Sequence, residues 1–228
     1  MSDHVRDLAT LREATDRLLT AVGKLDNAAI AAPSRLPGWT RGHVLAHLSR
    51  NADALVNVLA GRPMYASAEA RDGDIERDAP RPQQEQLADL RASAERFQEA
   101  AAADADWSRT VELRNGVTDT ASRVPFRRLI EVELHHVDLD VGYELEDLPA
   151  DFRQREITFL ADRFSGNSTV PQIAITATDG GQWTTGRPNG GVISVIGPSA
   201  DLLGWLAGRR EGTGLDCDGG LLPVLPAL

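Results

Sequence analysis

The amino-acid sequence predicts an α+β protein with a four-helix bundle at its N-terminus and a smaller α/β unit at its C-terminus. Two observations predict this class. Apolar residues recur with a helical period up to about residue 145, whereas segments that alternate between apolar and polar residues occur only after Pro149. We therefore expect two domains, 1–149 and 150–228, with the first domain folded as a bundle.

Four segments of the first domain have a helical pattern. Thr40 follows a break that contains two prolines and a glycine, so it is a suitable N-cap for the second helix. The acidic stretch 65–82 is expected to be an irregular, solvated loop, and 107–120 is expected to hold an extended piece. The predicted helices are 7–25, 40–60, 83–103 and 122–143.

The second domain combines helices with strands. A helix is expected at 152–164, and a second one at 199–208 that opens with a Ser199 cap. The last residues, 221–226, contain two prolines and are expected to lie extended. The strand candidates are 172–178, 182–185 and 191–196, with a turn at 179–181 between the first two.

Composition and charge exclude several classes of protein. The chain has 42% hydrophobic residues and a net charge of −10, which argues against a nucleic-acid partner because phosphate binding needs a basic patch. No apolar run approaches the ~20 residues of a membrane span, and the N-terminus does not resemble a signal peptide. We expect a cytoplasmic protein that acts on a small molecule. Cys217, the single cysteine, excludes an internal disulfide and is interpreted as structural.

Histidines and acids at helical spacing predict a metal site. His43 and His47 are four residues apart on the second predicted helix, and Glu131 and His135 have the same spacing on the fourth. Two histidines and one glutamate would leave a fourth position open, as in catalytic zinc sites. Asp138 could accept a hydrogen bond from a ligand imidazole. Spacing alone does not choose between His43 and His47, or between His135 and the adjacent His136.

Two motifs and the C-terminus resemble a known family. Residues 36–53, which contain Leu-Pro-Gly-Trp-Thr-Arg-Gly-His and His47, and residues 128–139, which contain Glu131 and His-His-Val-Asp-Leu, are similar to the motifs of mycothiol-dependent maleylpyruvate isomerases. Residues 201–209 and the Leu-Pro-Val-Leu-Pro tail resemble the small C-terminal domain of the same proteins. The resemblance implies a DinB-like metal-binding bundle whose ligands are His47, Glu131 and His135. His43 and His136 then become neighbours of the site that serve packing or hydrogen bonding.

The resemblance also implies an activity. The expected reaction is the cis–trans isomerisation of maleylpyruvate to fumarylpyruvate, with mycothiol as the thiol cofactor and zinc, or another divalent metal, activating the thiolate. It further implies a functional arginine in the C-terminal domain, for which Arg209 and Arg210 are the candidates. An arginine that faces the end of its own helix is an equally good interpretation of either residue. A dianionic substrate also requires a local basic pocket, to which Arg41, Arg50, Arg127, Arg128 and Arg209 could contribute.

Three alternatives remain open at this level. The first is a mycothiol S-transferase that uses the same metal site on a different electrophile, because pocket shape decides the substrate. The second is a non-enzymatic regulator that binds a metal or a thiol. The third is a helical interaction protein without a metal. The sequence leaves open the electrophile, the metal and the oligomeric state.

Overall fold

A computed structural model describes residues 3–227 of the chain. It contains two compact units that divide between Tyr143 and Glu144, and each unit is described by itself. The first unit is mainly helical and the second combines helices with a sheet, so the predicted α+β class is confirmed. None of the helices within this range is long and apolar enough to cross a membrane.

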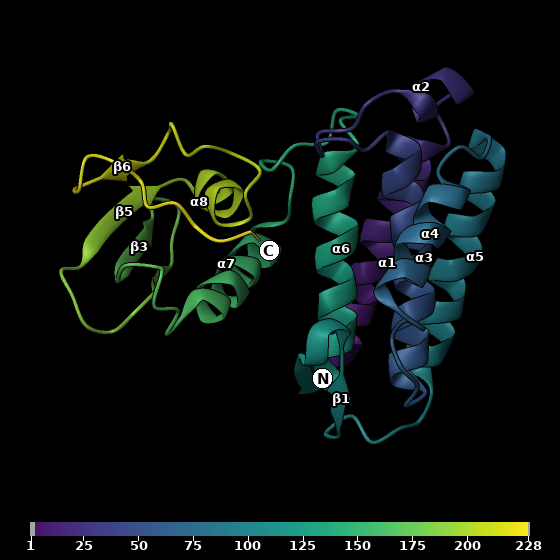
Figure 1. Ribbon diagram of the computed structural model, residues 1–228, viewed down its shortest axis with the longest axis horizontal. Coiled ribbons are helices and arrows are strands. Elements are labelled where there is room, and N and C mark those ends of the chain that lie inside the picture. The colour runs from purple at the N-terminus through teal and green to yellow at the C-terminus, as the bar shows by residue number, and fades with distance from the viewer. Residues whose placement is uncertain (1–2, 228) are drawn as a thin grey trace. The chain divides into compact units, whose positions relative to one another are not determined.

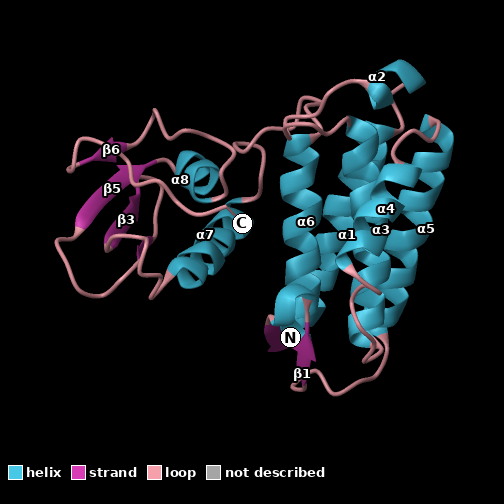
Figure 2. Ribbon diagram, viewed as in Figure 1, coloured by secondary structure: helices cyan, strands magenta, loops and turns pink. Residues whose placement is uncertain are grey.

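Four long helices form the bundle of the first unit (Figures 1 and 2). Helix α1 packs against α5 and α6, and α3 packs against the same two helices, so the four close into a ring. Leucines and one phenylalanine at its centre are fully buried, among them Leu18, Leu48, Phe97 and Leu129. The helices are α1 (Asp3–Val22), α3 (Arg41–Leu59), α5 (Gln83–Ala102) and α6 (Val124–Asp138).

Helix α3 begins where the sequence predicts. The Thr40 side chain accepts a hydrogen bond from the backbone N–H of His43, and the backbone N–H of Thr40 donates in return to Nδ1 of His43 at 3.2 Å. This reciprocal arrangement is a capping box, with histidine in the position that glutamate or glutamine usually occupies. It fixes the start of the helix that carries His47.

The expectation of an irregular loop at 65–82 is wrong, because this stretch contains helix α4 (Ala68–Asp78). The Ser67 side chain caps the helix by accepting from the N–H of Ala70. Ile75 is its single buried apolar residue, so the helical period is too weak to detect in the sequence. The short helix α2 (Asn27–Ala31), capped by Asp26, was also not predicted.

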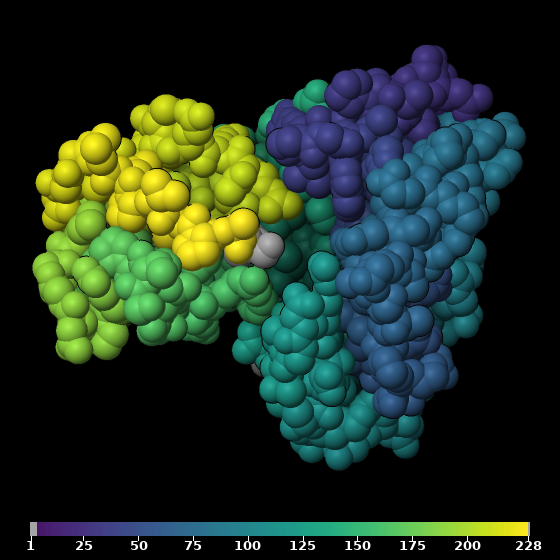
Figure 3. All heavy atoms as spheres, in the orientation of Figure 1, coloured from purple at the N-terminus to yellow at the C-terminus, as the bar shows by residue number. Residues whose placement is uncertain are grey.

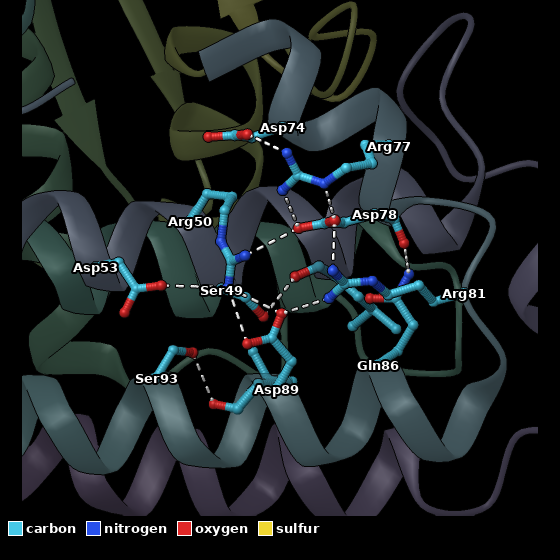
Figure 4. A network of polar contacts seen from close by, with 12 residues as sticks. Ser49, Arg50, Asp53, Asp74, Arg77, Asp78, Arg81, Gln86, Asp89 and Ser93 are labelled. Atoms are coloured by element: carbon cyan, nitrogen blue, oxygen red, sulfur yellow. Dashed lines mark hydrogen bonds and ion pairs between the residues drawn. The ribbon is translucent and has the colours of Figure 1, made fainter. Parts of the chain in front are cut away.

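Helix α4 is held in place by buried charge (Figure 4). Asp78, which is fully buried, accepts from Arg50 of α3 at 2.9 Å, from Arg77 at 2.9 Å and from Arg81 at 2.6 Å. Arg50 also contacts both carboxylate oxygens of Asp89 on α5 at 2.8 Å. These ion pairs connect α4 to two helices of the bundle.

A close backbone contact accompanies this network. A Cβ atom on Gly42, in the first turn of α3, would lie 2.1 Å from the carbonyl oxygen of Ala79 at the end of α4. Any larger residue at position 42 would therefore push the two helices apart. The Nε2 of Gln86 bridges the same place by donating to the carbonyl oxygens of Gly42, Asp78 and Ala79.

The extended piece expected at 107–120 is a hairpin. Strands β1 (Thr110–Glu112) and β2 (Thr118–Thr120) pair antiparallel around a short 3₁₀ turn, Arg114–Gly116. Asn115 and Gly116 have positive φ angles of 59° and 71°, which reverse the chain. The hairpin forms the surface at one end of the first unit (Figure 3).

A second 3₁₀ turn, Ala121–Arg123, leads from this hairpin into α6. Helix α6 ends at Asp138 rather than at the predicted residue 143. The positive φ angles of Asp140 (56°) and Gly142 (85°) explain the early end, since an α-helix cannot continue through them.

The second unit is a four-stranded sheet with two helices. The strand order is β4-β3-β5-β6; β3 pairs parallel with β5, and the other neighbours are antiparallel. Helix α7 contacts β4, whereas α8 contacts β3 and β5. The elements are α7 (Ala150–Phe164), β3 (Ile173–Ala177), β4 (Gln182–Thr185), β5 (Ile193–Gly197), α8 (Ser199–Leu206) and β6 (Asp216–Cys217).

The expected Ser199 cap is wrong in detail. Pro198 occupies the N-cap position, and Ser199 is the first residue of α8. The carboxylate of Asp179, in the turn after β3, instead accepts from the Ser199 backbone N–H at 2.9 Å and from its hydroxyl at 2.6 Å. A distant turn therefore caps this helix, which sequence neighbours could not reveal.

Candidate metal centre

The fold brings three of the predicted site residues together inside the first unit. His47 lies in the middle of α3, while Glu131 and His135 lie one turn apart on α6. Oε2 of Glu131 accepts from Nε2 of His47 at 2.9 Å and lies 3.2 Å from Nε2 of His135. One donor atom from each residue lies within 4.8 Å of the others. Two imidazoles and a carboxylate are a donor set that zinc accepts, so these residues fit a divalent metal.

The outer nitrogens of the two imidazoles meet different groups. Nδ1 of His135 donates to Oδ2 of Asp138 at 2.8 Å, which orients the ring with Nε2 toward Glu131. Nδ1 of His47 faces Nη2 of Arg71, from α4, at 3.3 Å. The His47 and His135 rings meet edge to face, with centroids 4.7 Å apart. The cluster is therefore positioned by groups from both α4 and α6.

Burial and mutual contact shift the ionisation of the three residues. Burial alone would raise the pKa of Glu131, but hydrogen bonds from His135 and His47 outweigh it and hold that pKa well below its usual value. Burial lowers the pKa of His47 despite the neighbouring carboxylate. For His135, the effects of Asp138 and Glu131 outweigh burial and raise its pKa. Glu131 is thus an anion that faces two imidazoles.

The two other histidines of the motifs have separate contacts. Nδ1 of His43 takes part in the capping box with Thr40, and its Nε2 lies 3.4 Å from a carboxylate oxygen of Glu76. The ring of His136 stacks on Tyr143 with centroids 4.1 Å apart and an interplanar angle of 15°. His43 therefore makes hydrogen bonds and His136 makes a packing contact, which are the kinds of contact expected for neighbours of the site.

Several arginines expected to line a basic pocket are engaged elsewhere. Arg41 donates to the carbonyl oxygens of Leu139 and Asp140. Arg50 belongs to the Asp78 network, and Arg127 donates to Asp119 at 2.7 Å. Carboxylates and carbonyls within the bundle therefore already occupy these three guanidiniums.

Arg128 differs from them. It is 2% exposed and donates to Oδ1 of Asn51 at 2.8 Å, one helical turn from His47 on α3. Burial lowers its pKa to about 10, although the charge of Glu131 acts in the opposite direction. It remains a cation near neutral pH, on the same helix as Glu131 and three residues before it.

Arg209 and Arg210 lie in the second unit, directly after α8. Arg210 forms ion pairs with Glu146 at 2.7 Å and with Asp201 at 2.6 Å. Nη1 of Arg209 donates to the carbonyl oxygen of Ala207 at 2.7 Å, in the manner of an arginine at a helix end. Their assignment as functional residues stays a prediction.

The sequence does not predict two further residues that lie near the cluster. Tyr65 precedes α4, and the guanidinium carbon of Arg71 lies 5.9 Å from the centre of its ring. Burial and then the charge of Glu131 raise the pKa of Tyr65, so its hydroxyl stays protonated at neutral pH. Both residues belong to the stretch expected to be irregular, and nothing in their spacing indicates a site.

Tyr65 also lines a cavity of about 510 Å³ in the first unit. The cavity lies between the segment that follows α3 and the β1–β2 hairpin, and Val58, Met64, Val111 and Leu113 form its apolar lining. Polar and charged residues line the rest of it, so the cavity offers both apolar surface and hydrogen-bonding groups to a small molecule.

A family model described as the mycothiol maleylpyruvate isomerase N-terminal domain matches residues 11–140, more than half of the chain. The chain belongs to this family. The match confirms the family resemblance of the sequence motifs and covers His47, Glu131 and His135. No curated protein matches the chain.

Solved structures of the isomerase family share this fold. The crystal structure of the mycothiol-dependent maleylpyruvate isomerase has a TM-score of 0.87 and 24% sequence identity, and the match covers 99% of this chain and 97% of that one. A histidine-to-alanine mutant of that enzyme has a TM-score of 0.89, with the same identity and coverage. The likeness extends over both units of the chain.

Proposed function

We propose that the protein catalyses the mycothiol-dependent cis–trans isomerisation of maleylpyruvate to fumarylpyruvate, with a divalent metal, zinc in the first instance, held by His47, Glu131 and His135. The observation that carries the proposal is the convergence of these three donors within 4.8 Å in a chain that belongs to the isomerase family. In a metal-free interaction protein, burying a carboxylate and two imidazoles together would cost free energy without a function to offset it.

The chemistry follows from the nature of the thiol. When bound, a divalent metal supplies a Lewis acid that lowers the pKa of a thiol, so that the thiolate forms near neutral pH. Addition of the thiolate sulfur to one carbon of the cis double bond moves the π electrons onto the conjugated carbonyl oxygen. Rotation then takes place about a single bond. Return of the electrons expels the thiolate and leaves the trans double bond, so no atom is gained or lost.

The residues of the chain prepare the site for these steps. Asp138 orients His135, and the capping box at Thr40 fixes the helix that carries His47. The hydroxyl of Tyr65 and the guanidinium of Arg71 provide hydrogen-bond donors beside the cluster, suited to the oxygen on which negative charge develops. Arg209 and Arg210 remain candidates for a further cationic contribution from the C-terminal domain.

The test follows maleylpyruvate by ultraviolet absorbance, using zinc-loaded protein with and without mycothiol. We expect conversion to fumarylpyruvate that requires both the protein and the thiol. His135→Ala, assayed in parallel, is the control for contaminating isomerase. Absence of conversion in a sample with confirmed metal would overturn the isomerase assignment and favour a mycothiol S-transferase, which is then tested with electrophiles such as monochlorobimane.

A further inference from the structure

The cavity beside Tyr65 is rich in positive charge. Arg62, Arg109 and Arg114 line it, together with a single acidic residue, Glu112. The whole chain carries a net charge of −10. A cavity with an excess of cations can bind an anionic ligand even in an acidic protein. Distant charges are screened by salt, so the ligand is attracted mainly by the cations nearest to it.

The guanidiniums of this cavity are not neutralised by carboxylate side chains. Arg62 donates to the neutral amide oxygen of Asn57 at 3.1 and 2.8 Å. Arg109 donates to the backbone carbonyl oxygens of Leu59 and Asp106. The side chain of Arg114 makes no hydrogen bond or ion pair with any residue of the described range 3–227. Its five N–H donors are therefore available to a ligand.

The hairpin presents Arg114 in a defined place. It lies in the turn between β1 and β2, where Asn115 and Gly116 reverse the chain with positive φ angles. The backbone N–H of Leu113 donates to the carbonyl oxygen of Val117 at 2.7 Å and closes the turn. The backbone that carries Arg114 is thus fixed, while its side chain is unengaged.

The cavity is connected to the candidate metal centre through Tyr65 and Arg71. Tyr65 lines the cavity, and Arg71 lies over its ring at 5.9 Å. The same guanidinium reaches Nδ1 of His47 at 3.3 Å. The positive charge of Arg114 acts on the Tyr65 hydroxyl as well. A ligand in the cavity would therefore meet Tyr65, which Arg71 contacts from outside the cavity lining, and would have Arg114 among the cations that surround it.

We propose that this cavity binds a small organic dianion and that Arg114 forms a charge-assisted hydrogen bond with one of its carboxylates. A guanidinium matches a carboxylate with two parallel N–H donors, which gives both affinity and orientation. The inference rests on the proposed function, since it assigns one carboxylate of maleylpyruvate to Arg114. Arg114 binds the substrate without taking part in bond making or breaking. Its loss should therefore raise KM more than it lowers kcat.

The test compares Arg114→Gln, Arg114→Lys and a control variant, Arg91→Gln, in the full-length metal-loaded protein. Arg91 is an exposed arginine of α5 whose side chain makes no hydrogen bond or ion pair within the described residues. Fumarate serves as a dicarboxylate probe in isothermal titration calorimetry, and maleylpyruvate turnover is measured separately. We expect Arg114→Gln to raise both the Kd of fumarate and the KM about tenfold, with kcat within about twofold. Arg114→Lys should recover part of the loss, and Arg91→Gln should match the unmodified protein.

The two readouts separate this inference from the proposed function. If fumarate binding depends on Arg114 but maleylpyruvate is not converted, the anion site stands and the isomerase assignment falls. If conversion occurs and Arg114→Gln leaves both KM and the fumarate Kd unchanged, the assignment of Arg114 is overturned while the isomerase stands. Failure of the unmodified protein to bind fumarate, or an equal loss in Arg91→Gln, also overturns the anion site.

Discussion

Asp138 and His135 form a hydrogen bond of 2.8 Å between Oδ2 and Nδ1, one turn along the same helix. Asp138 is fully buried, so its carboxylate faces this imidazole with little competition from water. The contact directs Nε2 of His135 toward Glu131 and makes it the more basic nitrogen. Groups that orient a ligand imidazole in this way contribute strongly to metal affinity in other proteins.

Replacing Asp138 by Asn should therefore weaken metal binding without removing a ligand. The amide has nearly the same volume as the carboxylate but no charge, so Nε2 of His135 becomes less basic and binds a metal more weakly. We expect the affinity for Zn²⁺ to fall about 10- to 100-fold, measured by competition with a chromogenic chelator. Asp16→Asn, at an exposed position on α1, is the control. An unchanged affinity in Asp138→Asn would remove Asp138 from the account of the site.

The three proposed ligands make a stronger prediction. His47→Ala, Glu131→Ala and His135→Ala should each lose bound metal, because two remaining donors hold zinc poorly. The bundle should stay folded, since other residues form its apolar core. Far-UV circular dichroism checks this. Elemental analysis of each purified variant gives the metal content per chain. His43→Ala is the matched control on α3 and should retain its metal; stoichiometric metal in all three ligand variants would refute the assignment.

The sequence predicted those parts of the molecule that depend on local pattern. Thr40 was predicted as a cap because the signals for a helix start lie in adjacent residues of the sequence. The structure confirms this cap. His47, Glu131 and His135 were predicted because each motif is contiguous in the chain. The spacing within each helix did not reveal which of two neighbouring histidines faces the other helix; family resemblance supplied that choice.

The features that escaped prediction depend on residues far apart in sequence. Helix α4 has one buried apolar residue and owes its position to Asp78, whose partner Arg50 lies 28 residues earlier. Tyr65 and Arg71 lie near the candidate metal centre because this helix packs against α3. The cap that Asp179 provides for α8 spans 20 residues. Such long-range polar contacts leave no periodic pattern in the sequence.

The Asp78 network predicts a large difference between two neighbouring aspartates. Asp78→Ala leaves the largely buried Arg50 without one of its carboxylates and should lower the free energy of unfolding by about 3–5 kcal/mol. Asp74 forms an ion pair with the same Arg77, but its side chain is 45% exposed. Asp74→Ala should therefore cost only about 0–1 kcal/mol. Urea unfolding followed by circular dichroism compares the two, and equal losses would contradict a structural role for the buried network.

Asp179 should make the second unit sensitive to acid. Hydrogen bonds from Ser199 to its carboxylate lower the pKa of Asp179 in the folded state. A lowered folded pKa means that the stabilisation is complete above the unfolded pKa of about 3.9 and is lost as pH falls through the folded value. Asp179→Ala should therefore lower the free energy of unfolding by about 1 kcal/mol at pH 7, the usual contribution of a helix cap.

The pH dependence distinguishes this cap from simple loss of packing. The difference in thermal midpoint between Asp179→Ala and the unmodified protein should be present at pH 7 and shrink toward pH 3, because the unmodified protein loses the same interaction when Asp179 is protonated. Asp151→Ala, whose side chain is 70% exposed in the first turn of α7, is the control and should change little at either pH. A midpoint difference that stays constant between pH 7 and pH 3 would mean that the carboxylate charge does not act on Ser199, and the side chain at 179 would then contribute through packing alone.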